Sequence, residues 1–298
     1  MKFAEIGYIK DGEKLWVKNC ILKLPKAIKE KYFFCLVPLK IEEIKLADER
    51  GYRITLPITK SEENIKLKER MIKKTIAFLM EKNIEIIINN DYIPMPVMFL
   101  QARGSLLLSY FVYEEIKNYC NKKKLDLGKL KISVKDGKNL ETFIVLSKLF
   151  GEINHLSICT DNEGEFSSFS NRVYEETGLV TEFFSNPKSI YMKEGDIVIN
   201  CSADMENYDY IFKKNALYIE CSSVKGKLKR IMERRQDLNF LYETSKTVGN
   251  ESLNSSQLEA LVFAKCKDIK KVVTGFKGEK SNGEASKFLD IASLVLKG

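Results

Sequence analysis

Histidine is almost absent from this sequence of 298 residues. His155 is the single histidine, and no Cys-x-x-Cys pair occurs. Zinc sites built from histidines, and Ser-His-Asp or Cys-His catalytic sites that use a histidine other than His155, therefore lack the residues they need. No metal site is expected. Proline and glycine are also scarce, with 6 and 16 residues, which excludes collagen-like repeats and extensive disorder. We expect a globular protein in which His155, at the start of an apolar run, has a structural role.

Long apolar runs are missing as well. No stretch approaches the roughly 18 consecutive apolar residues that a membrane-spanning helix needs, and the first residues do not begin a signal peptide. The seven cysteines are odd in number and scattered through apolar segments, which favours reduced thiols over a disulfide framework. We expect a cytoplasmic protein with no membrane partner. The abundance of isoleucine, lysine and asparagine is typical of an AT-rich bacterial genome.

The charge balance allows more than one interpretation. Lysine and arginine number 49 against 41 acidic residues, a formal net charge of +8, which favours acidic partners but fits an ordinary solvated surface equally well. A cationic stretch at 225–235 predicts a solvated helix face. Contact with RNA is the alternative for this stretch, and it depends on charge alone. A nucleic-acid partner is therefore not expected.

The length of the chain and its pattern predict two α/β domains. At about 100–200 residues per domain, 298 residues favour two domains over one. The first hundred residues contain a β-α-β unit, with a strand at 52–58, a helix from 59 to 82 and a buried strand at 84–88. Three earlier segments also have the pattern of strands: 3–9, 15–22 and 32–39.

From residue 129 the alternation of strands and helices becomes regular. Strands are predicted at 131–134, 155–160, 179–184, 197–201 and 216–221, with helices at 140–150 and 166–177. This spacing is typical of a parallel sheet with helices on both faces. The fold class is therefore an N-terminal α/β domain followed by a Rossmann-like parallel-sheet domain with C-terminal helices. The expected boundaries are 1–104 for the first domain, 105–128 for a linking helix, 129–245 for the second domain and 246–298 for helices that pack back. Helices are predicted towards the end of the chain near 228–244, 256–265 and 285–297.

Polar residues follow the predicted strands at the edge where parallel α/β sheets bind ligands. A short loop that enters a helix N-terminus offers backbone amides to a phosphate. An acidic residue after the second strand, here Asp161, can accept the hydroxyls of a ribose, and it disfavours a 2′-phosphate. The predicted cofactor-binding residues are Lys135, Asp136, Gly137, Lys138, Asn139, Asp161, Asn200, Cys201 and Ser202.

Residues 129–225 resemble the NAD(P)-binding domain of the shikimate dehydrogenase and glutamyl-tRNA reductase group. The resemblance is strongest at Gly195-Asp196-Ile-Val-Ile-Asn200, which is similar to the fourth-strand segment of that group. It implies an NAD(P)-dependent oxidoreductase that binds a small acid in a cleft between its domains, with NAD favoured over NADP by Asp161. The expected ligand is a small molecule, either a nucleotide or a small acid. The sequence is compatible with a homo-oligomer.

The glycine turn of this group is altered here, which supports a second hypothesis. The three glycine positions of the G-x-G-x-x-G pattern hold Lys135, Gly137 and Leu140. The added bulk favours weak or absent dinucleotide binding, and hence a non-catalytic ligand-binding or regulatory protein derived from the same fold. The catalytic residues are not identified. The resemblance offers Cys20 and Cys35 as nucleophiles, but both lie in apolar segments typical of buried structural thiols.

Overall fold

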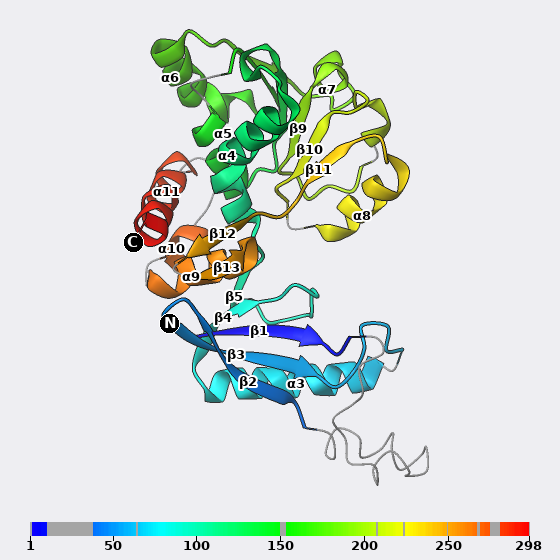
Figure 1. Ribbon diagram of the computed structural model, residues 1–298, viewed down its shortest axis with the longest axis vertical. Coiled ribbons are helices and arrows are strands. Elements are labelled where there is room, and N and C mark those ends of the chain that lie inside the picture. Colours follow the sequence, from blue (N-terminus) through cyan, green and yellow to red (C-terminus); the bar gives the residue numbers. More distant parts are fainter. Residues whose placement is uncertain are drawn as a thin grey trace. The chain divides into compact units, whose positions relative to one another are not determined.

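The chain forms two compact units, each with its own sheet (Figure 1). The computed structural model describes residues 2–10, 38–63, 65–149, 153–206, 208–222, 224–248, 250–266, 269–274 and 281–297. The first unit comprises Met1–Arg103 and Thr247–Lys267, and the second comprises Gly104–Lys246 and Asp268–Gly298. The predicted fold class, an α/β protein with a parallel Rossmann-like sheet after an N-terminal α/β sheet, is confirmed.

The first unit contains a five-stranded sheet in the order β2-β3-β1-β4-β5. Its central strand β1 pairs in parallel with β3 and β4, whereas the edge strand β2 is antiparallel to β3. The helix α3 (Ile65–Glu81) joins β3 to β4, as the β-α-β pattern predicts. The strands are β1 (Lys2–Tyr8), β2 (Lys40–Leu46), β3 (Glu49–Leu56), β4 (Ile84–Ile88) and β5 (Leu100–Ala102). The segment predicted as a strand at 15–22, most of that at 32–39, and both Cys20 and Cys35 lie outside the described residues.

A helix from late in the chain completes this unit. Figure 1 shows α3 on one face of the sheet and α9 (Ser255–Lys265) on the other, where α9 packs against β1, β4 and β5. The capping box of α9 pairs the N-cap Asn254 with Gln257, and nearly every residue of the helix is buried. A two-stranded sheet of β12 (Ser245–Val248) and β13 (Glu251–Asn254) precedes it.

The second unit contains a six-stranded sheet in which every pairing is parallel, as predicted. The order is β11-β10-β9-β6-β7-β8. Counted along the chain from β6, this is the order 3-2-1-4-5-6 that defines the Rossmann fold. The strands are β6 (Lys131–Lys135), β7 (His155–Cys159), β8 (Thr181–Phe184), β9 (Ile197–Asn200), β10 (Leu217–Glu220) and β11 (Asn239–Leu241). All residues of β9 and β10 are buried, which explains their continuous apolar pattern.

Helices cover both faces of this sheet. In Figure 1, α4 (Ser105–Lys123) and α5 (Leu140–Leu149) lie on one face, and α11 (Ser281–Lys297) packs on α5. On the other face, α7 (Ile190–Glu194) and α8 (Lys225–Arg234) share an apolar cluster with the strands. The helix α6 (Ser167–Thr177) ends at Gly178, whose φ of 74° is a left-handed conformation that favours glycine. A short helix, α10 (Ile269–Thr274), precedes α11.

One predicted helix differs strongly from the structure. The helix predicted at 228–244 is α8, which begins at Lys225 and ends at Arg234, while Asn239–Leu241 forms β11. The break follows from Arg235, whose guanidinium binds the Asp237 carboxylate and donates to the carbonyl oxygens of Asp209 and Phe212. These bonds turn the chain away from the helix axis and return it to the sheet. Among the described residues, no helix has the length and apolar character to span a membrane.

Candidate functional site

The turn after β6 lies at the carboxyl edge of the Rossmann sheet, next to the end of β9. Gly137 allows the backbone of the turn to lie close to the backbone of Cys201, directly after β9. A Cβ atom on Gly137 would lie 2.1 Å from the Cys201 carbonyl oxygen and 2.4 Å from the Asn139 side-chain nitrogen. The Asn139 amide donates to that same Cys201 carbonyl at 2.7 Å. The turn is therefore fastened to the neighbouring strand end, and only glycine fits at its centre.

Three backbone amides at this turn donate to side chains of the turn itself. Gly137 N donates to Thr142 Oγ1 at 3.0 Å, and Lys138 N donates to Asp136 Oδ1 at 2.7 Å. Thr142 N donates to Asn139 Oδ1 at 3.1 Å, which makes Asn139 the N-cap of α5. In a dinucleotide-binding turn, such amides point at the pyrophosphate. Here a phosphate would have to displace these three bonds.

The Asp136 carboxylate lies within the turn and is 6% exposed. Besides the Lys138 amide, it accepts a hydrogen bond at 2.9 Å from the Thr160 hydroxyl at the end of β7. The buried Asp136 carboxylate accepts hydrogen bonds from the Lys138 amide and the Thr160 hydroxyl, which could otherwise donate to a bound phosphate. Its negative charge also opposes a second anion at short range. The residues present therefore do not fit a pyrophosphate in the usual position.

Asp161, the predicted ribose ligand, lies at the carboxyl end of β7 and faces solvent. Its carboxylate forms an ion pair with Lys138 Nζ at 3.7 Å, and the two side chains are 66% and 63% exposed. Such an exposed pair contributes at most about 1 kcal/mol. Both groups remain accessible to a ligand at this edge.

Behind the turn, the ends of β9 and β10 carry a buried polar network. The Asn200 amide donates to Glu220 Oε1 at 2.6 Å, and its oxygen accepts from Lys227 Nζ at 3.2 Å and from Tyr208 OH at 3.1 Å. Glu220 also accepts from Tyr218 OH at 2.8 Å and from the Ser222 amide at 3.1 Å. Asn200 thus links the carboxylate to the ammonium group through one side chain.

Lys227 is the cation of this network. The solvated face predicted for 225–235 is wrong at this residue, whereas Lys229 and Arg234 of the same stretch are exposed. The Lys227 side chain is 1% exposed, and its ammonium lies 3.3 Å from Asp204 Oδ1. Burial lowers the pKa of Lys227, against the opposing effect of Asp204 and Glu220. Burial raises the pKa of Glu220, although its hydrogen bonds and Lys227 act in the other direction. In the interior, the positive charge of Lys227 therefore lies close to the carboxyl groups of Asp204 and Glu220.

Cys201 and Cys221 occupy neighbouring strand ends directly after the paired residues Asn200 and Glu220. Both side chains are fully buried. Burial raises the pKa of the Cys201 thiol, and contact with Cys221 adds to the effect. An enclosed thiol is out of reach of a substrate, so neither cysteine has the surroundings of a reactive residue.

The fold brings all nine predicted cofactor-binding residues to the carboxyl edge of one sheet. Lys138 and Asp161 are exposed, whereas Asp136, Asn200, Cys201 and Ser202 are buried. Sequence reasoning missed the contacts that Thr142, Tyr208, Glu220 and Lys227 make at this edge. One signal was available: Glu220 is a charged residue that ends a fully apolar strand, and such a residue needs a buried partner. Among the described residues, no group of three or more histidine, cysteine or acidic side chains is arranged to hold a metal ion.

The strand order and the site at its carboxyl edge define a Rossmann-type α/β protein. No protein-family model matches the chain, and no curated protein matches it. Similar solved structures include an L-tryptophan dehydrogenase from Nostoc punctiforme (11% identity, TM-score 0.35, 98% of this chain and 79% of that chain). They also include a shikimate dehydrogenase from Aquifex aeolicus (8%, 0.33, 96% and 97%) and an NAD-dependent formate dehydrogenase from Staphylococcus aureus in complex with NAD (11%, 0.30, 98% and 94%). Shikimate dehydrogenases, the group that residues 129–225 were predicted to resemble, are among these structures, while the fold assignment itself depends on the strand order.

Proposed function

We propose that this chain is a non-catalytic ligand-binding or regulatory protein with the fold of NAD(P)-dependent oxidoreductases, in which dinucleotide binding is lost or weak. The closed turn after β6 supports this proposal. The side chains of Asp136, Asn139 and Thr142 accept hydrogen bonds from three backbone amides at the turn, and a phosphate would compete with them. Charge-assisted hydrogen bonds to such amides supply much of the affinity for a phosphate, so their loss weakens binding strongly. The ligand would be a small anion that pairs with the exposed Lys138 ammonium on the solvent side of the turn, and not one that enters the turn beside the buried Asp136 carboxylate.

The second candidate is an NAD(P)-dependent oxidoreductase that binds a small acid in a cleft between the domains. Two observations favour it: the Rossmann strand order, and Asp161 at the end of β7, where a ribose-binding carboxylate is found in this fold. In this case NAD should bind more tightly than NADP, because the Asp161 carboxylate repels a 2′-phosphate. Replacing Asp161 with Ala should then reduce the preference for NAD over NADP without abolishing the binding of either dinucleotide.

Calorimetric titration of the purified chain with NAD and NADP separates the two candidates. The first predicts no binding below about 1 mM for either dinucleotide. Asp136→Asn removes the charge in the turn while nearly conserving its shape, and it should increase the affinity for NAD. Asp126→Asn is the matched control, because Asp126 caps a different turn by accepting from Gly128 N. Sub-micromolar binding of NAD by the wild type would establish the second candidate and refute the first.

A further inference from the structure

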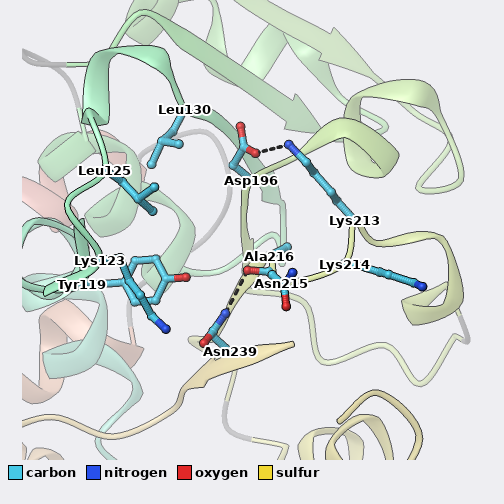
Figure 2. A pocket seen from close by; sticks show the side chains of 10 residues that line it. All are labelled: Tyr119, Lys123, Leu125, Leu130, Asp196, Lys213, Lys214, Asn215, Ala216 and Asn239. Atoms are coloured by element: carbon cyan, nitrogen blue, oxygen red, sulfur yellow. Dashed lines mark hydrogen bonds and ion pairs between the residues drawn. The ribbon is translucent and has the colours of Figure 1, made fainter. Parts of the chain in front are cut away.

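A pocket of about 360 Å³ opens at the amino edge of the Rossmann sheet, opposite the carboxyl edge that carries the turn. It is formed by the C-terminal end of α4, the segment before β6, and the loops that enter β9, β10 and β11 (Figure 2). Pockets of about 300–1,000 Å³ hold small organic molecules. The proposed function assigns nothing to this edge of the sheet.

One wall of the pocket is apolar. Tyr119, Leu125 and Leu130 form this wall, and Leu125 is 42% exposed although it is a large aliphatic residue. Tyr119 and Lys123 are four residues apart on α4, so their side chains lie on one face of the helix, as Figure 2 shows. An aromatic ring placed against this wall would cover Leu125 and contact the Tyr119 ring.

The opposite wall is polar and already held in place. Asn239 donates to the Asn215 carbonyl oxygen at 2.9 Å, and Asn215 N donates to the Asp237 carbonyl at 3.0 Å. Asn215 has a φ of 64°, a left-handed conformation that asparagine tolerates better than most residues. This loop is therefore fixed before any ligand binds, which reduces the entropic cost of binding.

The charges of the pocket favour an anion. Its single carboxylate, Asp196, is neutralised, because Oδ1 pairs with Lys213 Nζ at 2.5 Å and Oδ2 accepts from Lys131 N at 3.0 Å. Lys123 and Lys214 also line the pocket, so cations outnumber the carboxylate. Burial raises the pKa of the Tyr119 phenol, which keeps its hydroxyl protonated and able to donate beside Lys123.

From this geometry we infer that the pocket at the amino edge binds a small aromatic anion, with the ring against Tyr119, Leu125 and Leu130 and the anionic group at Lys123. The shared chemistry is a flat ring that carries a phosphate or a carboxylate. The inference is independent of the proposed function, because the two sites lie at opposite edges of the same sheet.

Phenyl phosphate is the probe, with phenol and inorganic phosphate as its separate halves. Leucine methyl groups labelled with ¹³C report binding by NMR, since Leu125 and Leu130 line the pocket while Leu140 begins α5 at the carboxyl edge. We expect saturable shifts at Leu125 and Leu130 with a dissociation constant of about 1 mM, as is usual for a fragment of this size. Benzoate should give the same shifts, and each half of the probe should bind at least about tenfold more weakly.

Lys123→Gln and Lys122→Gln form a matched pair, because both lysines lie in the last turn of α4 and complement its dipole, but only Lys123 lines the pocket. Lys123→Gln should weaken phenyl phosphate binding by about tenfold, and Lys122→Gln should leave it unchanged. The inference is overturned if the two variants weaken binding equally, if inorganic phosphate binds as tightly as phenyl phosphate, or if no saturable shift appears at Leu125 and Leu130. Shifts at Leu140 alone would overturn it as well, and would point to the site of the proposed function.

Discussion

The ammonium nitrogen of Lys227 lies 3.0 Å from the phenolic oxygen of Tyr208, in a part of the interior where the lysine side chain is 1% exposed. The same ammonium also lies 5.0 Å from the centroid of the Tyr208 ring. Tyr208 is thus both a hydrogen-bond partner and an aromatic neighbour of the charge. This contact ties the loop after β9 to the first turn of α8.

Replacing Lys227 with Met should lower the free energy of unfolding by about 3–5 kcal/mol, because Asp204, Asn200 and Tyr208 would lose a buried partner. Lys229→Met is the control on the same helix. Lys229 is 81% exposed and pairs with Glu233 at 3.8 Å, so this change should cost about 0.5 kcal/mol or less. Urea denaturation measures both variants. A loss below about 1 kcal/mol for Lys227→Met would show that the network contributes little to stability.

Glu220 should make stability depend on pH. Burial raises its pKa in the folded state above the value of 4.5, so the folded state holds the proton more tightly than the unfolded chain. The stability that this supplies is complete below pH 4.5 and is lost as the pH rises through the raised pKa. The wild type should therefore lose stability relative to Glu220→Gln over that interval. Urea denaturation of both proteins between about pH 4 and 8 measures their free energies of unfolding. If the wild type gained stability relative to Glu220→Gln as the pH rises, the raised pKa of Glu220 would be contradicted.

Gly137→Ala should destabilise the protein by about 3 kcal/mol, because the new methyl group would overlap the Cys201 backbone, which cannot rotate away. Gly226→Ala is the contrasting change. Nothing lies within 4 Å of its added Cβ, and alanine favours the helix α8, so a gain of up to about 1 kcal/mol is expected. Thermal unfolding of the two variants should shift in opposite directions. A wild-type melting temperature for Gly137→Ala would mean that the turn is not fastened to β9.

The described cysteines should differ in reactivity. Cys266 is half-buried, whereas Cys120, Cys159, Cys201 and Cys221 are buried. Burial also raises the pKa of Cys159 to about 11, so little thiolate is present at neutral pH. Cys266 should therefore be alkylated first in the native protein, as peptide mass spectrometry can show, with the other four reacting only in denaturant. Labelling of Cys201 or Cys221 as fast as Cys266 would contradict the buried positions.

The sequence predicts five of the six strands of the Rossmann sheet because these strands are largely buried and carry apolar runs, with polar residues near their ends, as with Asn200 after Ile197–Ile199. The sixth strand, β11, is half-buried and was predicted as part of a helix. Elements with weaker signals were missed. Strand β2 carries charged residues at most positions, since it is an edge strand with its side chains largely in solvent. Strand β5 has three residues, too few for any periodicity.

The chemistry of the site was less predictable than its location. The sequence places Asp136 and Asn139 in the turn after β6, but the hydrogen bonds that close the turn depend on side-chain directions that spacing does not define. Lys227 was predicted to be solvated because its neighbours are cationic. Its burial follows from contacts with Asn200 and Tyr208, which lie far away in the sequence. Long-range pairing of this kind leaves no local pattern.

The assignment of α9 to the first unit has a consequence for the order of folding. The sheet of Met1–Arg103 needs Thr247–Lys267 to cover one face, so about 140 residues of the second unit are synthesised before the first can be completed. At about 5–20 residues per second, the nascent first unit would expose that apolar face for several seconds or more. A ribosome-bound chain that stops before α9 should therefore recruit chaperones, while one that extends beyond Lys267 should release them.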